Sequence, residues 1–135
     1  YFKKQLQPHI DGERVTLVGE VDDAKKQPFL AGAAALLFPI DWPEPFGLVM
    51  IEALAHGTPV IAYPNGAAPE IIEDGVTGFL ADDESDATTA LSRVDTIDRN
   101  RCRAAVEGYF SARRMVHDYE RLYQRVVSGS GLRTG

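Results

Sequence analysis

Two glutamates and a glycine in the stretch 44–62 are the residues of this chain best suited to bind a charged ligand rich in hydroxyl groups. Glu44 lies in a loop that Pro43 and Pro45 stiffen, and Glu52 follows eight residues later within a run of apolar residues. A carboxylate in apolar surroundings is costly unless it accepts hydrogen bonds. Sugar hydroxyls are suitable donors, so this pattern favours carbohydrate or ribose binding.

Gly47 directly precedes a helix that the sequence predicts over residues 48–56. The first turn of a helix has free N–H groups and carries the positive end of the helix dipole, so it binds anions such as phosphate. Gly47 has no side chain, which would let a ligand approach the backbone closely. In open α/β sheets, ligands collect at the edge where such helices begin. We therefore expect a phosphate site at this helix start.

Each glutamate also has a structural interpretation. Glu44 would stabilise the positive end of the helix dipole, an effect of about 0.3–1 kcal/mol. Glu52 would accept hydrogen bonds from backbone amides of a neighbouring loop and never touch a ligand. Because a buried glutamate is often structural, two glutamates at this spacing favour neither interpretation by themselves.

Short β-rich runs alternate with helical patterns along the chain, as in parallel βαβ architecture. Strands are predicted at residues 15–18, 36–38, 59–63 and 78–80, and helices at about 22–31, 48–56, 69–73, 86–94, 98–108 and 111–127. Asp22 or Asp23 and Ser111 are suitable N-caps. The last helix has one apolar face, formed by Met115, Tyr119, Leu122, Tyr123 and Val126. The predicted fold class is α/β, with a Rossmann-like doubly wound parallel sheet.

Composition excludes several function classes. The chain is 44% hydrophobic and 25% charged, and no apolar run reaches the roughly 18 residues that a membrane helix needs. The net charge of −6 argues against a nucleic-acid surface, and the arginines between Arg93 and Arg125 alternate with acidic residues, which predicts solvated helix surface. A single cysteine, Cys102, excludes an internal disulfide, and with three scattered histidines it disfavours a zinc site.

Several segments together resemble the retaining GT-B glycosyltransferases of family four, or group one. EPFGL at 44–48 followed by EALAHGTPVIA at 52–62 resembles the family's Glu-x7-Glu signature. VTLVGEV at 15–21 is similar to the family's strand and loop beside the nucleotide base. Residues 35–39 resemble the strand before the signature, and residues 64–80 resemble the stretch after it. Residues 110–123 resemble the family's closing helix. Residues 65–68 depart from the paired glycines common in the family, which leaves open how closely this loop approaches the donor. Glu70 matches a family glutamate that capping or loop bracing would explain equally well.

The resemblance implies roles for individual residues. Glu44 would contact hydroxyls of the donor sugar, and Glu52 would hold the ribose hydroxyls. The main chain near Val21 would touch the base. The sugar and diphosphate would meet the backbone of Phe46, Gly47 and Leu48. The glutamates would bind the ligand rather than exchange protons with it, so the resemblance implies no catalytic acid or base. It also implies no metal or other cofactor, because the helix dipole and basic side chains would stabilise the charge of the diphosphate.

The resemblance also implies a domain arrangement. Residues 1–127 would be part of the C-terminal, donor-binding half of a GT-B fold without its first two strands, and residues 128–135 a flexible tail. The parent enzyme would transfer a hexose from a nucleotide-diphosphate sugar to an acceptor with retention, and would need an N-terminal acceptor domain and a basic clamp on the diphosphate. We expect the isolated chain to be inactive, and its unpaired sheet edge to favour a dimer or a complementing chain. A cytoplasmic location is expected, with peripheral membrane association open for the parent.

Other function classes fit less well. A phospho-accepting receiver domain is also doubly wound, and Asp22, Asp23 and Asp41 follow predicted strands, but no lysine follows Lys26 to complete such a site. A non-catalytic nucleotide-binding module of the same fold is the main alternative, although both glutamates of the signature are present. The signature does not favour a GT-B epimerase. The GxGxxG and GxxxxGK[ST] patterns are both absent.

Overall fold

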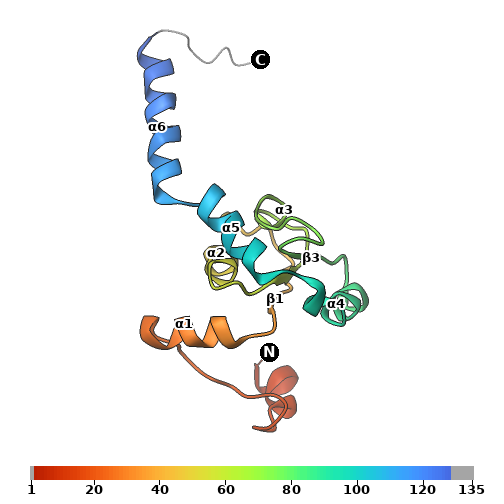
Figure 1. Ribbon diagram of the computed structural model, residues 1–135. Helices are drawn as coiled ribbons and strands as arrows, with labels where there is room; N and C mark the ends of the chain where they lie inside the picture. The colour runs from red at the N-terminus through yellow and green to blue at the C-terminus, as the bar shows by residue number, and fades with distance from the viewer. Residues whose placement is uncertain (1, 129–135) are drawn as a thin grey trace.

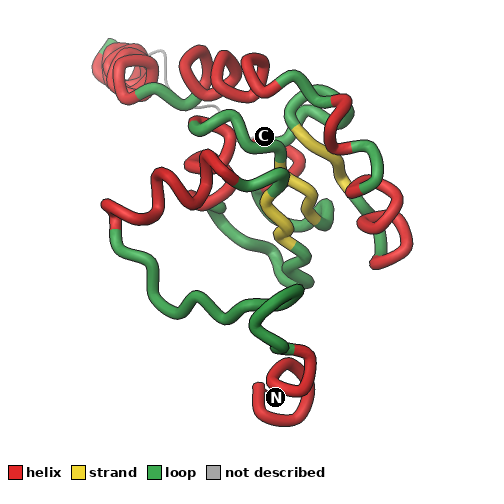
Figure 2. The backbone as a smooth tube through the Cα atoms, turned by 60° about the horizontal axis from the view of Figure 1, so that its bottom comes forward, coloured by secondary structure: helices red, strands yellow, loops and turns green. Residues whose placement is uncertain are grey.

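The centre of the protein is a parallel β-sheet of three short strands. The computed structural model describes residues 2–128, and the sheet has the order β1-β2-β3, with β1 at Leu36–Phe38, β2 at Val60–Ala62 and β3 at Gly78–Leu80. Leu36 pairs with Val60, and Val60 with Gly78. Parallel strands require crossover connections, which contain α2 (Leu48–Ala55) and the short α3 (Ala68–Ile71). Figure 2 shows helices on either side of the strands, and the predicted α/β class is confirmed.

The remaining helices are α1 (Asp23–Gly32), α4 (Glu84–Leu91), α5 (Arg99–Tyr109) and α6 (Ala112–Val127), with short helical turns at Phe2–Leu6, Gln7–His9 and Val94–Thr96. Side-chain N-caps explain where the longer helices begin. Asp22, Asp83, Asp98 and Ser111 each accept a hydrogen bond from a first-turn amide of the helix that follows. The predicted helices are confirmed, although α3 ends two residues early and α4 is shifted toward the N-terminus by two to three residues.

Helix α2 lies between the sheet and α5 and supplies the centre of the core. Met50, Ala53 and Leu54 of α2 and Val60 of β2 are fully buried. Gly57 follows α2 at a φ of +75°, and a Cβ atom there would overlap the guanidinium of Arg103. The chain must therefore turn without a side chain at this point, which allows α5 to pack closely against α2.

Two arginines of α5 do not form the solvated helix surface that was predicted for the arginines between Arg93 and Arg125. Arg99 donates to the carbonyls of Ala33 at 2.9 Å and Ala31 at 2.8 Å, and to Thr58 Oγ1 at 3.0 Å. Arg103 donates to the His56 carbonyl at 3.2 Å. Both side chains therefore satisfy carbonyls at the ends of α1 and α2 rather than forming solvated helix surface, because helix C-termini leave unpaired carbonyls that a cation can bind.

The predicted strand at residues 15–18 does not form. Val15, Leu17 and Val18 are 46%, 62% and 55% exposed, and within the described residues β1 pairs only with β2. A strand forms only where its backbone N–H and C=O groups meet those of a neighbouring strand. Instead, Asp11 Oδ1 accepts from the amides of residues 13–15, which lowers the pKa of its carboxyl and leaves this segment in a turn and an extended loop.

Helix α6 projects away from the body of the molecule, as Figure 1 shows. Its predicted single apolar face is present, but the residues that form it are exposed, to between 37% for Leu122 and 61% for Tyr123. The predicted flexible tail, apart from Ser128, lies outside the described residues. Among residues 2–128, no helix is both long and apolar enough to cross a membrane.

Candidate functional site

The start of α2 offers two unpaired backbone donors. Gly47 is the N-cap, at a φ of +69°, and its carbonyl accepts from the Met50 amide at 2.9 Å. The amides of Leu48 and Val49 have no hydrogen-bond partner among the described residues. Because the positive end of the helix dipole is at the same place, this helix start can bind an anion.

The backbone conformation and the packing at position 47 both favour glycine. The φ of +69° is a conformation that other residues rarely adopt, and a Cβ atom there would overlap the methyl group of Met50, which is fully buried. The turn into α2 therefore depends on Gly47, as its place in the sequence indicates. Phe46 and Leu48 on either side are 59% and 58% exposed.

Glu44 lies beside this helix start. Its Oε1 atom accepts from the Gly47 amide at 3.2 Å, so the carboxylate is held next to the turn, while Oε2 has no partner among residues 2–128. The contact agrees with the structural interpretation of Glu44, because an acidic group stabilises a helix N-terminus. It also leaves one carboxylate oxygen available to a ligand bound at the same place.

The loop at residues 65–67 holds the backbone of Glu44. The Ala67 amide donates to the Glu44 carbonyl at 2.8 Å, and Asn65 Nδ2 donates to the Ile40 carbonyl at 3.2 Å. Gly66 has a φ of +57°, and a Cβ atom there would overlap backbone atoms of both Glu44 and Pro43. Sequence reasoning left the role of this loop open. In the structure its glycine permits close packing against the segment that carries Glu44.

Glu52 is bound by a lysine that sequence reasoning did not assign to the site. Its side chain is 27% exposed, and Oε1 accepts from Lys26 Nζ of α1 at 2.8 Å. The pKa of Lys26 is raised, first by this hydrogen bond to Glu52 and then by the one to Asp23. The prediction that Glu52 accepts a hydrogen bond is confirmed. The structural alternative, in which backbone amides of a neighbouring loop donate to it, is wrong, because the donor is the Lys26 side chain. Its Oε2 atom has no partner among residues 2–128.

Val21 is placed by the same helix that carries Lys26. It is half-buried and immediately precedes Asp22, whose side chain caps α1 by accepting from the Lys25 amide at 2.9 Å. The main chain near Val21 is therefore anchored to the start of α1, one turn before the lysine that reaches Glu52. The segment near Val21, predicted to contact the base, and Glu52, predicted to bind the ribose, are thus linked through α1.

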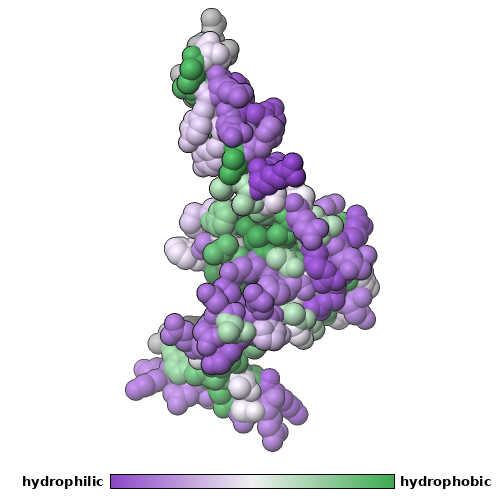
Figure 3. All heavy atoms as spheres, turned by 60° about the vertical axis from the view of Figure 1, so that its left-hand side comes forward, coloured by the Kyte–Doolittle hydropathy of each residue, from purple (hydrophilic) through white to green (hydrophobic). Residues whose placement is uncertain are grey.

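Phe46 and Leu48 open onto a groove of about 450 Å³ between α2 and the start of α6. Tyr109, Phe110 and Met115 form its far wall, and the Arg114 guanidinium lies 3.6 Å from the centre of the Tyr109 ring. Figure 3 shows apolar surface, in green, on the body below the projecting helix. The groove gives the predicted site an apolar margin next to the unpaired amides.

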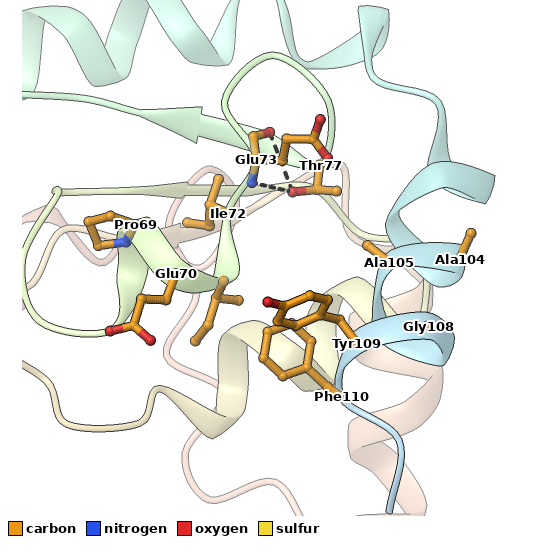
Figure 4. Close-up of a pocket in the computed structure, with 11 residues that line it drawn as sticks. Pro69, Glu70, Ile72, Glu73, Thr77, Ala104, Ala105, Gly108, Tyr109 and Phe110 are labelled. Carbon is orange, nitrogen blue, oxygen red and sulfur yellow. Dashed lines mark hydrogen bonds between the residues drawn. The ribbon is translucent and has the colours of Figure 1, made fainter. Parts of the chain in front are cut away.

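A second hollow, of about 540 Å³, lies between α3 and the end of α5. Figure 4 shows Tyr109 and Phe110 on one side of it and Glu70 with its carboxylate directed away from those rings. The Glu73 amide donates to Thr77 Oγ1 at 3.0 Å, which fixes the turn into β3. Glu70 lies in the first turn of α3, and its carboxylate has no hydrogen bond or ion pair within residues 2–128. Nor do three or more Asp, Glu, His or Cys side chains gather into a metal-binding group in this part of the chain.

Comparisons with known proteins agree on one family. Residues 2–96 match the family described as glycosyl transferases group 1. The chain is 32% identical over 127 residues to the N-acetyl-alpha-D-glucosaminyl L-malate synthase of Bacillus anthracis, covering 88% of this chain and 32% of that protein. It is 36% identical over 102 residues to the phosphatidyl-myo-inositol mannosyltransferase of Mycobacterium leprae, covering 70% of this chain and 27% of that protein.

A solved structure agrees as well. The sucrose-phosphate synthase of Thermosynechococcus elongatus superposes with a TM-score of 0.77 and 28% sequence identity, covering 95% of this chain and 34% of that one. The chain therefore spans about a third of the length of the proteins it resembles.

Proposed function

We propose, because this chain belongs to the group 1 glycosyl transferases, that it binds the nucleotide-diphosphate sugar from which such an enzyme transfers a sugar. The diphosphate would accept hydrogen bonds from the amides at the start of α2. Glu44 would bind hydroxyls of the donor sugar, with the backbone of Phe46, Gly47 and Leu48 beside it, and Glu52 would bind the ribose. The main chain near Val21 would contact the base.

The observation that carries this proposal is the pair of unpaired amides, Leu48 and Val49, next to a carboxylate that is already held in place. A diphosphate is an anion with several acceptor oxygens, and a helix N-terminus supplies both donors and a favourable dipole. A carboxylate there would repel the phosphate unless a group with hydroxyls lies between them. A sugar attached to the diphosphate supplies those hydroxyls.

The two glutamates share one property that suits hydroxyl recognition. Each uses Oε1 to accept from a protein donor and has Oε2 without a partner among the described residues. The protein donor fixes the carboxylate, and the second oxygen can accept from a ligand hydroxyl. Hydrogen bonds to a charged acceptor contribute about 1.5–3 kcal/mol each, enough to select a sugar or a ribose over an analogue that lacks the hydroxyl.

The enzyme in which this chain acts would transfer a hexose with retention of anomeric configuration to an acceptor held by an N-terminal domain. The reaction would take place in the cytoplasm. The chain alone would not catalyse transfer, because charge on the departing diphosphate needs compensating cations. Removing a single such group commonly slows a reaction by about 100-fold or more. Lys26 does not fill this role, since it is bonded to Glu52 and Asp23.

A non-catalytic nucleotide-binding module is the second candidate. It is favoured by the protein partners of both carboxylates, Gly47 for Glu44 and Lys26 for Glu52, because a structural role would need nothing more. The two candidates differ in the sugar. A donor-binding domain should bind a nucleotide-diphosphate sugar in a manner that depends on Glu44, whereas a module that recognises only the nucleotide should not.

Calorimetric titration tests the proposal. The chain is titrated with UDP, GDP and ADP, and then with the sugar nucleotides of the base that binds. Glu52→Ala should weaken binding of the nucleoside diphosphate by about tenfold or more, as expected for loss of a hydrogen bond to a charged acceptor. Glu107→Ala, which removes an exposed glutamate of α5, is the matched control and should change nothing. Wild-type affinity in Glu52→Ala would contradict the assigned role.

A further inference from the structure

The strongest unassigned feature near the site is the connection that Lys26 makes between α1 and α2. Asp22 caps α1, and the Lys26 amide donates to the Asp22 carbonyl at 2.8 Å, so the backbone of this lysine is fixed in the first turn. Its side chain then reaches Glu52 Oε1 on α2 at 2.8 Å. The two residues are 26 positions apart in the sequence, so the bond joins separate elements.

Lys26 differs from an ordinary surface cation. Its neighbour Lys25 has a side chain that is 76% exposed and pairs with Asp22 on the same helix at 3.2 Å, an arrangement that contributes little to stability. The Lys26 side chain is 32% exposed and that of Glu52 is 27% exposed, so the ammonium and the carboxylate meet where solvent is partly excluded. Attraction between them is screened less there than at Lys25.

Glu52 needs such a partner because its own helix gives it none. The neighbouring residues Ile51 and Ala53 are buried, and α2 supplies no polar side chain that bonds to the Glu52 carboxylate. A glutamate has three side-chain torsions, and without a partner its carboxylate would sample several orientations. The bond from Lys26 fixes Oε1 and so limits where Oε2 lies.

We propose that Lys26 is a positioning residue for ribose recognition: it binds Oε1 of Glu52 and thereby orients Oε2 to accept hydrogen bonds from the ribose hydroxyls. This inference rests on the proposed function of Glu52 as the ribose-binding carboxylate. Lys26 acts through Glu52 and does not touch the ligand. Because Val21 directly precedes Asp22, the N-cap of the same helix, Lys26 also fixes the ribose-binding carboxylate relative to the segment proposed to contact the base.

The experiment measures discrimination between a nucleotide with ribose hydroxyls and one without. The 135-residue chain is titrated with UDP, GDP and ADP, and the one that binds most tightly is compared with its 2′,3′-dideoxy counterpart. Wild type should prefer the ribonucleotide. Lys26→Met should reduce that preference about tenfold by weakening ribonucleotide binding alone, since the dideoxy compound has no hydroxyl for Glu52 to accept from. Lys26→Arg should restore most of it.

Two controls separate positioning from other effects. Lys25→Met removes the same charge from the adjacent position and should leave the preference unchanged. In a Glu52→Gln background, Lys26→Met should have no further effect on the preference, because residues that act as one unit are not additive. Thermal unfolding of each variant shows that the chain remains folded during the titration.

Three results would overturn the inference. If wild type prefers the ribonucleotide and Lys26→Met keeps that preference in full, Lys26 is only a surface ion pair, and the proposed function of Glu52 stands. If Lys26→Met reduces the preference equally in the wild-type and Glu52→Gln backgrounds, Lys26 contacts the ribose directly. If wild type shows no preference at all, the proposed function fails, and this inference fails with it.

Discussion

Replacement of Gly66 by alanine should show how tightly the loop at residues 65–67 holds the segment of Glu44. The φ of +57° at this position would cost a non-glycine residue about 1–2 kcal/mol. The added Cβ would also overlap the N and O atoms of Glu44, and backbone atoms cannot rotate away as a flexible side chain can. Overpacking of this kind adds about 1–3 kcal/mol.

Gly75→Ala is the matched control, because Gly75 has a φ of +73° and a Cβ atom there would meet nothing within 4 Å. Both glycines are exposed, so the control carries the conformational cost without the overlap. Urea unfolding monitored by circular dichroism gives the free energy of unfolding of each variant. Gly66→Ala should be less stable than Gly75→Ala by about 1–3 kcal/mol.

The functional consequence should appear in the same pair of variants. Moving the backbone of Glu44 displaces its carboxylate from Gly47, so Gly66→Ala should weaken binding of a nucleotide-diphosphate sugar more than binding of the nucleotide alone. Gly75→Ala should leave both unchanged. If the two variants unfold within about 0.5 kcal/mol of each other, which is the usual range for surface substitutions, the loop does not constrain Glu44 and the reasoning is refuted.

Three further predictions concern the rest of the fold. Arg99→Met should destabilise the chain by about 1–3 kcal/mol in urea unfolding, because the partly buried Ala33 carbonyl loses its donor. Exposed Arg101→Met should stay within about 0.5 kcal/mol of wild type. Burial raises the pKa of the Cys102 thiol, so as the pH rises above about 8.5 the thiol loses its proton first in the unfolded state, and the free energy of unfolding should fall. Because Cys102 is buried, a thiol reagent should react with it only at the rate at which the chain unfolds. Rapid reaction of the folded chain would contradict the burial of this thiol. Light scattering should detect self-association through the open edge of β1, where Leu37 is 53% exposed, and a clean monomer at high concentration would be evidence against it.

The elements that could be predicted from the sequence are those whose causes are local. Asp22 and Ser111 cap helices that begin where the capping residues indicate, and Gly47 marks the turn into α2 because its φ of +69° is one that other residues rarely adopt. The strand at residues 15–18 was predicted from its β-branched and apolar residues, but a strand also needs a neighbour to pair with. That requirement is non-local, and no pattern within the segment reports it.

The same distinction applies to the site. Sequence reasoning indicated that Glu52 requires a donor, since the apolar residues around it are local. It did not identify Lys26, because nothing in the spacing of residues 26 and 52 shows that α1 and α2 lie side by side. The packing of Gly66 against Glu44 and the bonds from Arg99 to the end of α1 were missed for the same reason. Each depends on contacts between segments far apart in the chain.

The most direct test of the account observes the two amides themselves. Addition of the nucleoside diphosphate that binds should shift the ¹H–¹⁵N resonances of Leu48 and Val49, with the proton signals moving downfield as the amides donate to phosphate oxygens. The shifts should saturate together with the calorimetric isotherm and shrink with the corresponding nucleoside, which has no phosphate. If these two resonances stay in place while the signals of residues around the hollow between α3 and α5 move, the ligand binds elsewhere and the account is contradicted.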